Sequence, residues 1–196
     1  MWHALLHDLR GCLGGLKATL DLREPGAGLE ARDAARLEAG VREGLALSEL
    51  ARALAFGPWP AGALEHVDDW AGALGPQLGA LAATFRGRCG LVLKGRDPWP
   101  GALLRSITLS VARQLLPQAL PEALAVEAEA RPDAWILAFS PVLAPPLALQ
   151  PGGAPKDLHG LWIRAVVDRC AITASHTGER LELRIPRGAG GLPPVE

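Results

Sequence analysis

The sequence predicts an α+β protein in two parts: an N-terminal antiparallel helical hairpin, followed by a sandwich in which helices cover one face of a mixed sheet. Three observations lead to this fold class. Apolar residues recur at helical spacing through the first 56 residues, Pro- and Gly-rich stretches interrupt that pattern, and helical and strand-like segments alternate afterwards. With 196 residues, 49% of them hydrophobic, the chain is long enough for one ordinary domain or two small ones.

Composition argues against several classes of function. The formal net charge of −1 provides no basic surface for non-specific binding to nucleic acid or acidic lipid. No apolar run approaches the roughly 20 residues that span a bilayer, and the first residues carry charge too early for a secretory signal. Cys12, Cys89 and Cys170 lie far apart in the sequence with no C-x-x-C motif, so neither a disulfide framework nor a zinc knuckle is indicated. We therefore expect a cytoplasmic protein with no membrane or nucleic-acid partner.

Residues 1–57 are expected to form the hairpin. In residues 1–22 the apolar side chains recur with the spacing 4-3-4-3-4, the seam of a helix that packs in a bundle. Pro and Gly at 23–28 end this helix, and a second helix is predicted from about 32 to 56 by its Ala, Leu, Glu and Arg content. The seam of the first helix consists of Trp2, Leu6, Leu9, Leu13, Leu16 and Leu20.

Two helices of this length cannot bury all of their apolar surface against each other. We expect the hairpin to pair with a second copy in a four-helix bundle, which would make the protein a homodimer. The alternative is that the hairpin packs on the remainder of its own chain.

Residues 58–62 are the expected linker, 63–186 the second domain and 187–196 a flexible tail. Asp68 or Asp69 is the expected N-cap of the first helix after the linker. Five prolines predict a loop over 141–155. The periodicities predict helices over 69–85, 99–116 and 158–171, and strands over 90–95, 123–130, 134–140 and 180–185.

The clearest chemical signal lies in the first helix, where His7, Asp8, Leu9 and Arg10 follow one another. His7 comes directly after the seam residue Leu6, so it is expected on the exposed flank of the bundle. A neutral imidazole is a nucleophile, and the adjacent Asp8 carboxylate can orient it or take its proton. Arg10 could meet the charge of an incoming phosphoryl group. The alternative is an ordinary solvated histidine.

The same flank carries glycines and a lysine. Gly11, Gly14 and Gly15 each cost a helix roughly 1 kcal/mol relative to alanine, so a bare backbone is expected to serve close approach by a partner. Arg10, Gly14 and Lys17 follow His7 at helical spacing on one flank. We therefore expect Gly11, Gly14 and Lys17 to bind a partner.

The remaining histidines carry no comparable signal. His66 stands near Asp68 and Asp69, but no further ligand has suitable spacing, so no metal site is expected. His159 and His176 are expected in loops or helix caps.

The motif around His7 resembles the H-box of dimerising histidine kinases, in which the phosphorylated His is followed by an acid, a hydrophobic residue and Arg. His7, Asp8 and Arg10 match those positions, whereas Cys12 stands where Pro is usual. Hairpin, linker and α+β domain also follow one another as in those kinases. The resemblance covers residues 1–186 and implies a Bergerat (HATPase-like) fold for the second domain.

The second domain departs from that family at the nucleotide site. Ser110 and Gln114 stand where the two Asn of the nucleotide-binding helix belong, and both are poor replacements for a metal-ligating Asn. No Asp follows the strand that ends at Ser140, and the Gly-rich loop retains only Gly160. We therefore expect neither ATP nor a metal to bind, and no cofactor.

A bundle with an acceptor His and an empty ATPase-like domain resembles the dimeric histidine phosphotransferases of bacterial phosphorelays. The resemblance implies that a phosphorylated response-regulator receiver domain docks beside the hairpin and passes its phosphoryl group to His7, from which it moves to the Asp of another receiver. Mg²⁺ would come with the receiver. Kinases that also act as phosphatases usually carry Thr or Asn where Gly11 stands, so transfer without efficient phosphatase activity is expected.

Two other functions stay open at this point. The chain could be an ATP-dependent histidine kinase fragment, which ATP binding or autophosphorylation would reveal. It could also be a non-catalytic dimeric scaffold or anti-sigma-like regulatory module, in which His7 is idle.

Overall fold

The computed structural model describes residues 2–21, 31–56, 64–95 and 97–187. Within the two N-terminal helices the description of some residues is limited to the backbone, and His7 and Cys12 are among them. The expected linker at 58–62 and residues 188–196 of the expected tail lie outside the described residues.

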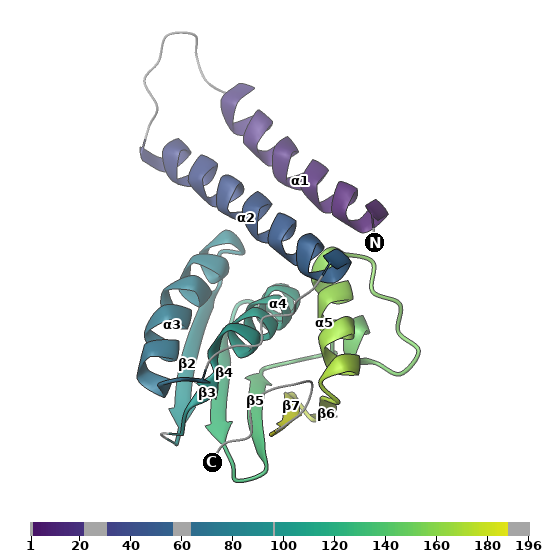
Figure 1. Cartoon of the computed structure of the whole chain (residues 1–196). Helices are drawn as coiled ribbons and strands as arrows, with labels where there is room; N and C mark the ends of the chain where they lie inside the picture. Colours follow the sequence, from purple (N-terminus) through teal and green to yellow (C-terminus); the bar gives the residue numbers. More distant parts are fainter. Residues whose placement is uncertain (1, 22–30, 57–63, 96, 188–196) are drawn as a thin grey trace.

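The hairpin consists of α1 (Trp2–Asp21) and α2 (Ala31–Phe56), which lie side by side and antiparallel (Figure 1). Gly40 of α2 permits their close approach, because a Cβ at this position would lie 2.6 Å from Cδ2 of Leu16. Leu9 and Leu16, both seam residues, are half-buried. The 4-3-4 apolar spacing thus predicted the helix, whereas Leu13 and Leu20 of the same seam are exposed in the single chain.

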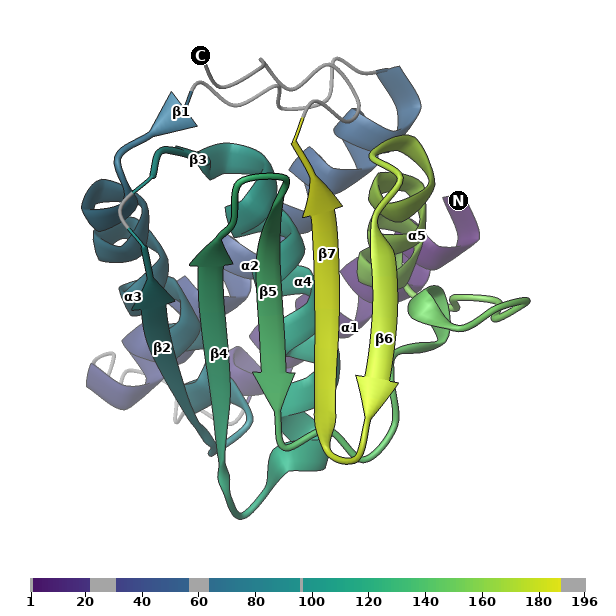
Figure 2. The same ribbon diagram turned by 90° about the horizontal axis from the view of Figure 1, so that it is seen from below.

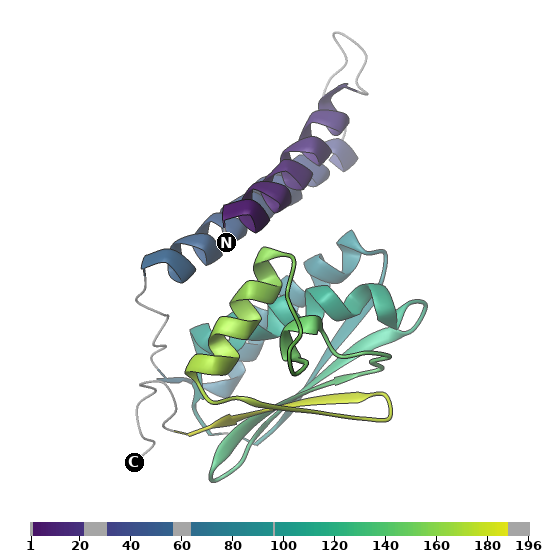
Figure 3. The same cartoon turned by 90° about the vertical axis from the view of Figure 1, so that its right-hand side faces the viewer.

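The second part is a layer of helices on a five-stranded mixed sheet with the strand order β2-β4-β5-β7-β6. β2 and β4 are parallel and the other pairs antiparallel. Figures 2 and 3 show the helices on one face of the sheet and the hairpin beyond the helices. The α+β fold class is thereby confirmed. The elements are α3 (Val67–Thr84), α4 (Gly101–Ala119), α5 (Leu158–Arg169), β2 (Arg88–Lys94), β4 (Ala123–Ala130), β5 (Ala134–Ser140), β6 (Thr173–Thr177) and β7 (Arg180–Pro186).

Side-chain alternation explains why the helices cover only one face. Along β4, Leu124, Val126 and Ala128 are buried while the residues between them are half-exposed. β7 repeats this pattern. The core lies between the inward side chains and the central helix α4. Trp70 of α3 and Trp99 stack in it with ring centroids 5.2 Å apart.

Several predicted boundaries were wrong. Helix α3 begins at Val67, and its N-cap is His66, whose Nδ1 accepts a hydrogen bond from the Asp68 amide, in place of Asp68 or Asp69. Trp99 does not begin α4, because Trp99–Pro100 form a short strand, β3, paired with β1 (Leu64–Glu65). The expected loop contains a 3₁₀ turn, Leu147–Leu149.

Strand β6 was not predicted from the sequence. β6 has the sequence Thr-Ala-Ser-His-Thr and every residue in it is exposed, so no apolar alternation marks it. Pairing with β7 holds it in place, together with the His176 ring, which lies 2.9 Å from the Val142 carbonyl oxygen. His176 is therefore in a strand, where a loop or cap was expected.

Among the described residues, the hairpin packs on the remainder of its own chain around Leu47 and Ala51 of α2. Leu47 and Ala51 of α2 form a small apolar cluster with Leu158 of α5, and Leu9 and Leu50 pack against it. Among the hairpin residues whose side chains are described, the large exposed hydrophobic ones are Leu13 (62%), Leu20 (49%), Val41 (53%) and Leu45 (63%).

Ion pairs cross the outer face of the sheet. Glu127 of β4 accepts hydrogen bonds at 3.0 Å from both Lys94 of β2 and Arg180 of β7. The bond from Arg180 and, next, the bond from Lys94 lower the pKa of Glu127 from 4.5 to about 2. Lys94 thus connects β4 to its neighbour β2, and Arg180 connects β4 to β7 across the intervening strand β5.

Glu127→Gln is expected to lower the free energy of unfolding at pH 7 by about 1 kcal/mol, the size of partly exposed ion pairs. Because the native pKa of Glu127 is depressed, its contribution is complete above the unfolded value of 4.5 and is lost as the pH falls toward 2. Urea unfolding at pH 7 and pH 3 should therefore show a smaller difference from the wild type at pH 3. Glu122→Gln, at an exposed position just before β4, is the control, and a pH-independent difference for Glu127→Gln would contradict this assignment.

Candidate functional site

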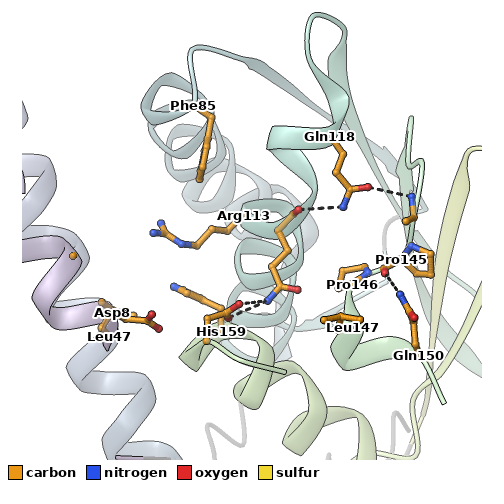
Figure 4. Close-up of a pocket in the computed structure, with 14 residues that line it drawn as sticks. Asp8, Leu47, Phe85, Arg113, Gln118, Pro145, Pro146, Leu147, Gln150 and His159 are labelled. Carbon is orange, nitrogen blue, oxygen red and sulfur yellow. Dashed lines mark hydrogen bonds between the residues drawn. The ribbon is translucent and has the colours of Figure 1, made fainter. Parts of the chain in front are cut away.

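A groove of about 800 Å³ separates the hairpin from the second part of the chain. Its walls come from α1, α2, the end of α3, α4, the start of α5 and the loop between β5 and α5 (Figure 4). The lining residues include Asp8, Gly11, Leu47, Phe85, Arg113, Gln114, Gln118, Pro145, Leu147, Gln150, Asp157 and His159. Two of them, Asp8 and Gly11, belong to the turn of α1 that contains His7.

The candidate residues of the first helix all lie in α1. His7 has a helical backbone, and its side chain lies outside the described residues. Arg10, Gly11, Gly14 and Lys17 are exposed, as expected for one accessible flank, while Asp8 is half-buried.

The glycines of this flank face open space. A Cβ built on Gly11, Gly14 or Gly15 meets nothing within 4 Å. These glycines are therefore not required by packing among the described residues. They leave the backbone of α1 accessible directly after the turn that contains His7.

Asp8 reaches across the groove to the second part of the chain. Its Oδ2 accepts a hydrogen bond of 2.8 Å from the backbone N–H of Leu158, the first residue of α5. Asp157 is the N-cap of this helix, and its Oδ1 accepts from the N–H of Gly160 at 2.6 Å. Two carboxylates thus satisfy N–H groups at the positive end of one helix dipole.

Ser110 and Gln114 of α4, which were expected to stand where the kinases have Asn, also contact the start of α5. Oγ of Ser110, a buried residue, lies 3.2 Å from Nδ1 of His159, and Gln114 Nε2 donates to Asp157 Oδ1 at 3.1 Å. Gly160 fits this arrangement because a Cβ there would lie 2.7 Å from Cβ of Pro155 and 3.1 Å from Gln114 Nε2. The single retained glycine therefore serves packing between α4, α5 and the preceding loop.

The loop before α5 is held from both sides. Gln118 of α4 accepts a hydrogen bond from the Ala144 amide at 3.1 Å. Arg164 of α5 donates to the carbonyls of Gln150 at 2.8 Å and Gly153 at 3.1 Å. Also lining the groove, the Arg113 guanidinium of α4 lies 5.8 Å from the centroid of the Phe85 ring. The groove is thus lined by both charged and apolar groups.

In the described part of the chain we also looked for reactive cysteines, groups of metal ligands and membrane-spanning helices. Burial raises the pKa of Cys89 to about 11 and also raises that of Cys170, so both thiols are poor nucleophiles at neutral pH. Among the described residues no three His, Cys, Asp or Glu side chains are grouped as metal ligands. None of the described helices combines the length and the apolar character that crossing a membrane requires.

Most of the groove could not be found from the sequence. Asp8 and Leu158 are 150 residues apart, and nothing near Leu158 marks its amide as the partner of an acid in α1. His159 was expected in a loop or cap, whereas it lies in the first turn of α5 and lines the groove. The departures at Ser110 and Gln114 were visible, but their contacts to α5 were not.

No family model matches this sequence, and no curated protein is similar enough to count as a relative. Solved structures do match. A bacterial phosphotransferase is 20% identical with a TM-score of 0.51, and the match covers 92% of this chain and 91% of that one. The histidine kinase AdeS of Acinetobacter baumannii is 15% identical with a TM-score of 0.58, covering 93% of this chain and 98% of that one.

Full-length ShkA, solved in complex with AMPPNP, is 15% identical with a TM-score of 0.53, and the match covers 93% of this chain but 42% of that one. The chain has the fold of these proteins. Since each match spans more than nine-tenths of this chain, the likeness includes the hairpin as well as the α+β part.

Proposed function

We propose that this protein is a histidine phosphotransferase of two-component signalling, which carries phosphoryl groups between receiver-domain aspartates on His7 without using ATP. The proposal is supported chiefly by the hydrogen bonds at the N-terminus of α5. There Gln114, which stands where a kinase has a nucleotide-binding Asn, and the amide of Gly160 both donate hydrogen bonds to Asp157, and the groove beside them opens onto the His7 turn.

The contacts of α5 support the absence of ATP from the reaction. A helix N-terminus that accepts a phosphate needs unoccupied N–H groups. In this chain the N–H groups of Leu158 and Gly160 donate to carboxylates of Asp8 and Asp157. A nucleotide phosphate would meet these negative charges at the place where a kinase-like fold would hold it.

The proposed transfer is a phosphoryl exchange between nitrogen and oxygen. An imidazole nitrogen of neutral His7 attacks the phosphorus of the receiver's aspartyl phosphate, an N–P bond forms, and the P–O bond to the carboxylate breaks with its electron pair on that oxygen. The imidazolium proton passes to water or a neighbouring base. Arg10, exposed three residues along α1, can stabilise charge on the phosphoryl oxygens, and the receiver supplies Mg²⁺.

The exposed flank of α1 supports docking of a receiver domain. Gly11 and Gly14 have open space where a Cβ would be, and Lys17 is exposed on the same helix. A receiver surface that packs against this backbone would bring its aspartyl phosphate to the His7 turn. The groove wall formed by the second part of the chain would then lie beside the docked domain.

The exposed apolar side chains of the hairpin support a homodimer. Val41 and Leu45 are four residues apart on α2, and Leu13 and Leu20 are seven apart on α1, so each pair lies along one helix face. Such an apolar stripe on a two-helix hairpin fits a four-helix bundle with a second copy.

His7→Ala is expected to abolish phosphotransfer. The protein is mixed with a panel of receiver domains that have been phosphorylated with acetyl phosphate and freed of the reagent, and the label is followed on gels. The wild type should acquire acid-labile, base-stable phosphate from at least one receiver, and His7→Ala should acquire none. His3→Ala, one helical turn earlier, is the control and should retain the label.

Three results would overturn the proposal. Labelling of the wild type by ATP, together with ATP binding in calorimetry, would instead indicate a kinase. Absence of transfer from every receiver would indicate that His7 is not an acceptor. Receiver binding unchanged by His7→Ala, without any transfer, would favour a non-catalytic scaffold.

Gly14→Ala is expected to separate stability from docking. Alanine in an open helical position should raise the free energy of unfolding by about 0.5–1 kcal/mol, while the new methyl group should weaken receiver binding. Gly72→Ala in α3 is the matched control, because a Cβ at Gly72 also meets nothing within 4 Å. Chemical unfolding and receiver titration measure the two effects, and equal receiver affinity for both variants would remove Gly14 from the docking surface.

Leu45→Glu is expected to convert the dimer to a monomer, because the side chain is 63% exposed in the single chain and would be buried in the bundle. Sedimentation velocity measures the mass. Leu143→Glu is the control, since Leu143 is 69% exposed but lies outside the hairpin. A wild type that sediments as a monomer at tens of micromolar would contradict dimerisation.

A further inference from the structure

We propose that Asp8 acts as a positioning residue: its carboxylate fastens the second part of the chain, through the N-terminus of α5, to the turn of α1 that contains His7. The inference rests on the proposed function for its effect on phosphotransfer. It differs from the role that the kinase resemblance gives to this acid, which is to orient or deprotonate the histidine ring.

The contact itself is specific in its chemistry. The first N–H groups of a helix have no acceptor within the helix. For Leu158, the first residue of α5, the acceptor is Asp8 Oδ2 at 2.8 Å. A hydrogen bond to a carboxylate is stronger than one between neutral groups, and the helix dipole adds to it. Figure 4 shows Asp8 extending from α1 toward His159 in the same turn of α5.

Apolar contacts beside this hydrogen bond also join the hairpin to the second part of the chain. Leu158 is fully buried, and its side chain packs on Leu47 and Ala51 of α2. Polar and apolar contacts therefore converge on one residue of α5 from both helices of the hairpin. Opening the groove requires both contacts to separate.

The contact also sets the position of the far wall of the groove. Asp157, the residue before Leu158, is bonded to Gln114 of α4, and Arg164 of α5 holds the loop that ends at Asp157. A receiver docked at the His7 turn would meet this wall at a distance fixed by the bond between Asp8 and Leu158. Loss of the bond should therefore weaken receiver docking more than it slows the chemical step.

The Leu158 amide reports the contact directly. Its hydrogen exchange is measured by NMR in the full chain, with no receiver present, so the result does not depend on the proposed function. Asp8→Ala should accelerate exchange of the Leu158 amide at least about tenfold, the effect of losing a charge-assisted hydrogen bond. The Gly160 amide is the internal control, because its acceptor is Asp157.

Asp8→Asn separates positioning from acid–base chemistry. An asparagine carbonyl can accept the Leu158 hydrogen bond but cannot take a proton from His7. Asp8→Asn should therefore keep part of the Leu158 protection. In transfer from a phosphorylated receiver, Asp8→Ala should raise KM about tenfold and change kcat by less than about threefold, and Asp8→Asn should recover most of the KM.

A second pair of variants removes the donor and leaves Asp8 intact. Proline is accepted at the first position of a helix, and the extended backbone of Asp157 (φ −111°, ψ 167°) suits a residue before proline. Leu158→Pro and Leu158→Ala both lose the buried side chain, and only the first also loses the N–H. Leu158→Pro should raise KM about as much relative to Leu158→Ala as Asp8→Ala does relative to the wild type.

Two results would overturn the inference. Unchanged exchange of the Leu158 amide in Asp8→Ala would mean that the carboxylate does not hold α5. A kcat that falls equally in Asp8→Asn and Asp8→Ala, with KM unchanged and Leu158→Pro matching Leu158→Ala, would assign Asp8 to acid–base chemistry. If the wild type transfers no phosphoryl group, the proposed function fails, while the exchange data still decide whether Asp8 holds α5.

Discussion

The need of one helix end for hydrogen-bond acceptors organises the candidate site. The N-terminus of α5 presents N–H groups without partners in the helix, and such an end attracts negative charge. In this chain the negative charge comes from within, from Asp157 and from Asp8 of α1. This helix end is thereby the place where the two parts of the chain meet.

Elements with a strong period were predictable from the sequence. The seam of α1, the alternation of β4 and β7 and the turn between β4 and β5 each follow from local spacing, because one face of each element must be buried. β6 could not be found in this way, since its residues are polar and only its pairing with β7 holds it. The pairing of β1 with β3 is equally invisible, because each has two residues.

In the candidate site, too, groups that are close in sequence could be predicted, whereas contacts between distant residues could not. The motif of His7, Asp8 and Arg10 could be predicted because these residues stand within four positions of one another, and Ser110 and Gln114 could be placed on one helix by their spacing. The replacement contacts were not predictable. Gln114 and Asp157 are 43 residues apart, and their hydrogen bond depends on how α4 and α5 pack, which no local spacing encodes.

Helix α2 shows how domain docking and the proposed pairing of two copies can be compatible. Leu47 and Ala51 are buried against α5, whereas Val41 and Leu45 are exposed, and the two-residue step from Leu45 to Leu47 corresponds to a rotation of about 200° around the helix. The two sets lie on different faces of one helix, so a second copy could cover the exposed set without displacing α5. The His7 turn belongs to the end of the hairpin that is docked. A receiver domain that reaches this turn would therefore meet α1 and the groove wall together, and the fit of that wall, rather than any bound nucleotide, would be the contribution of the second part to transfer.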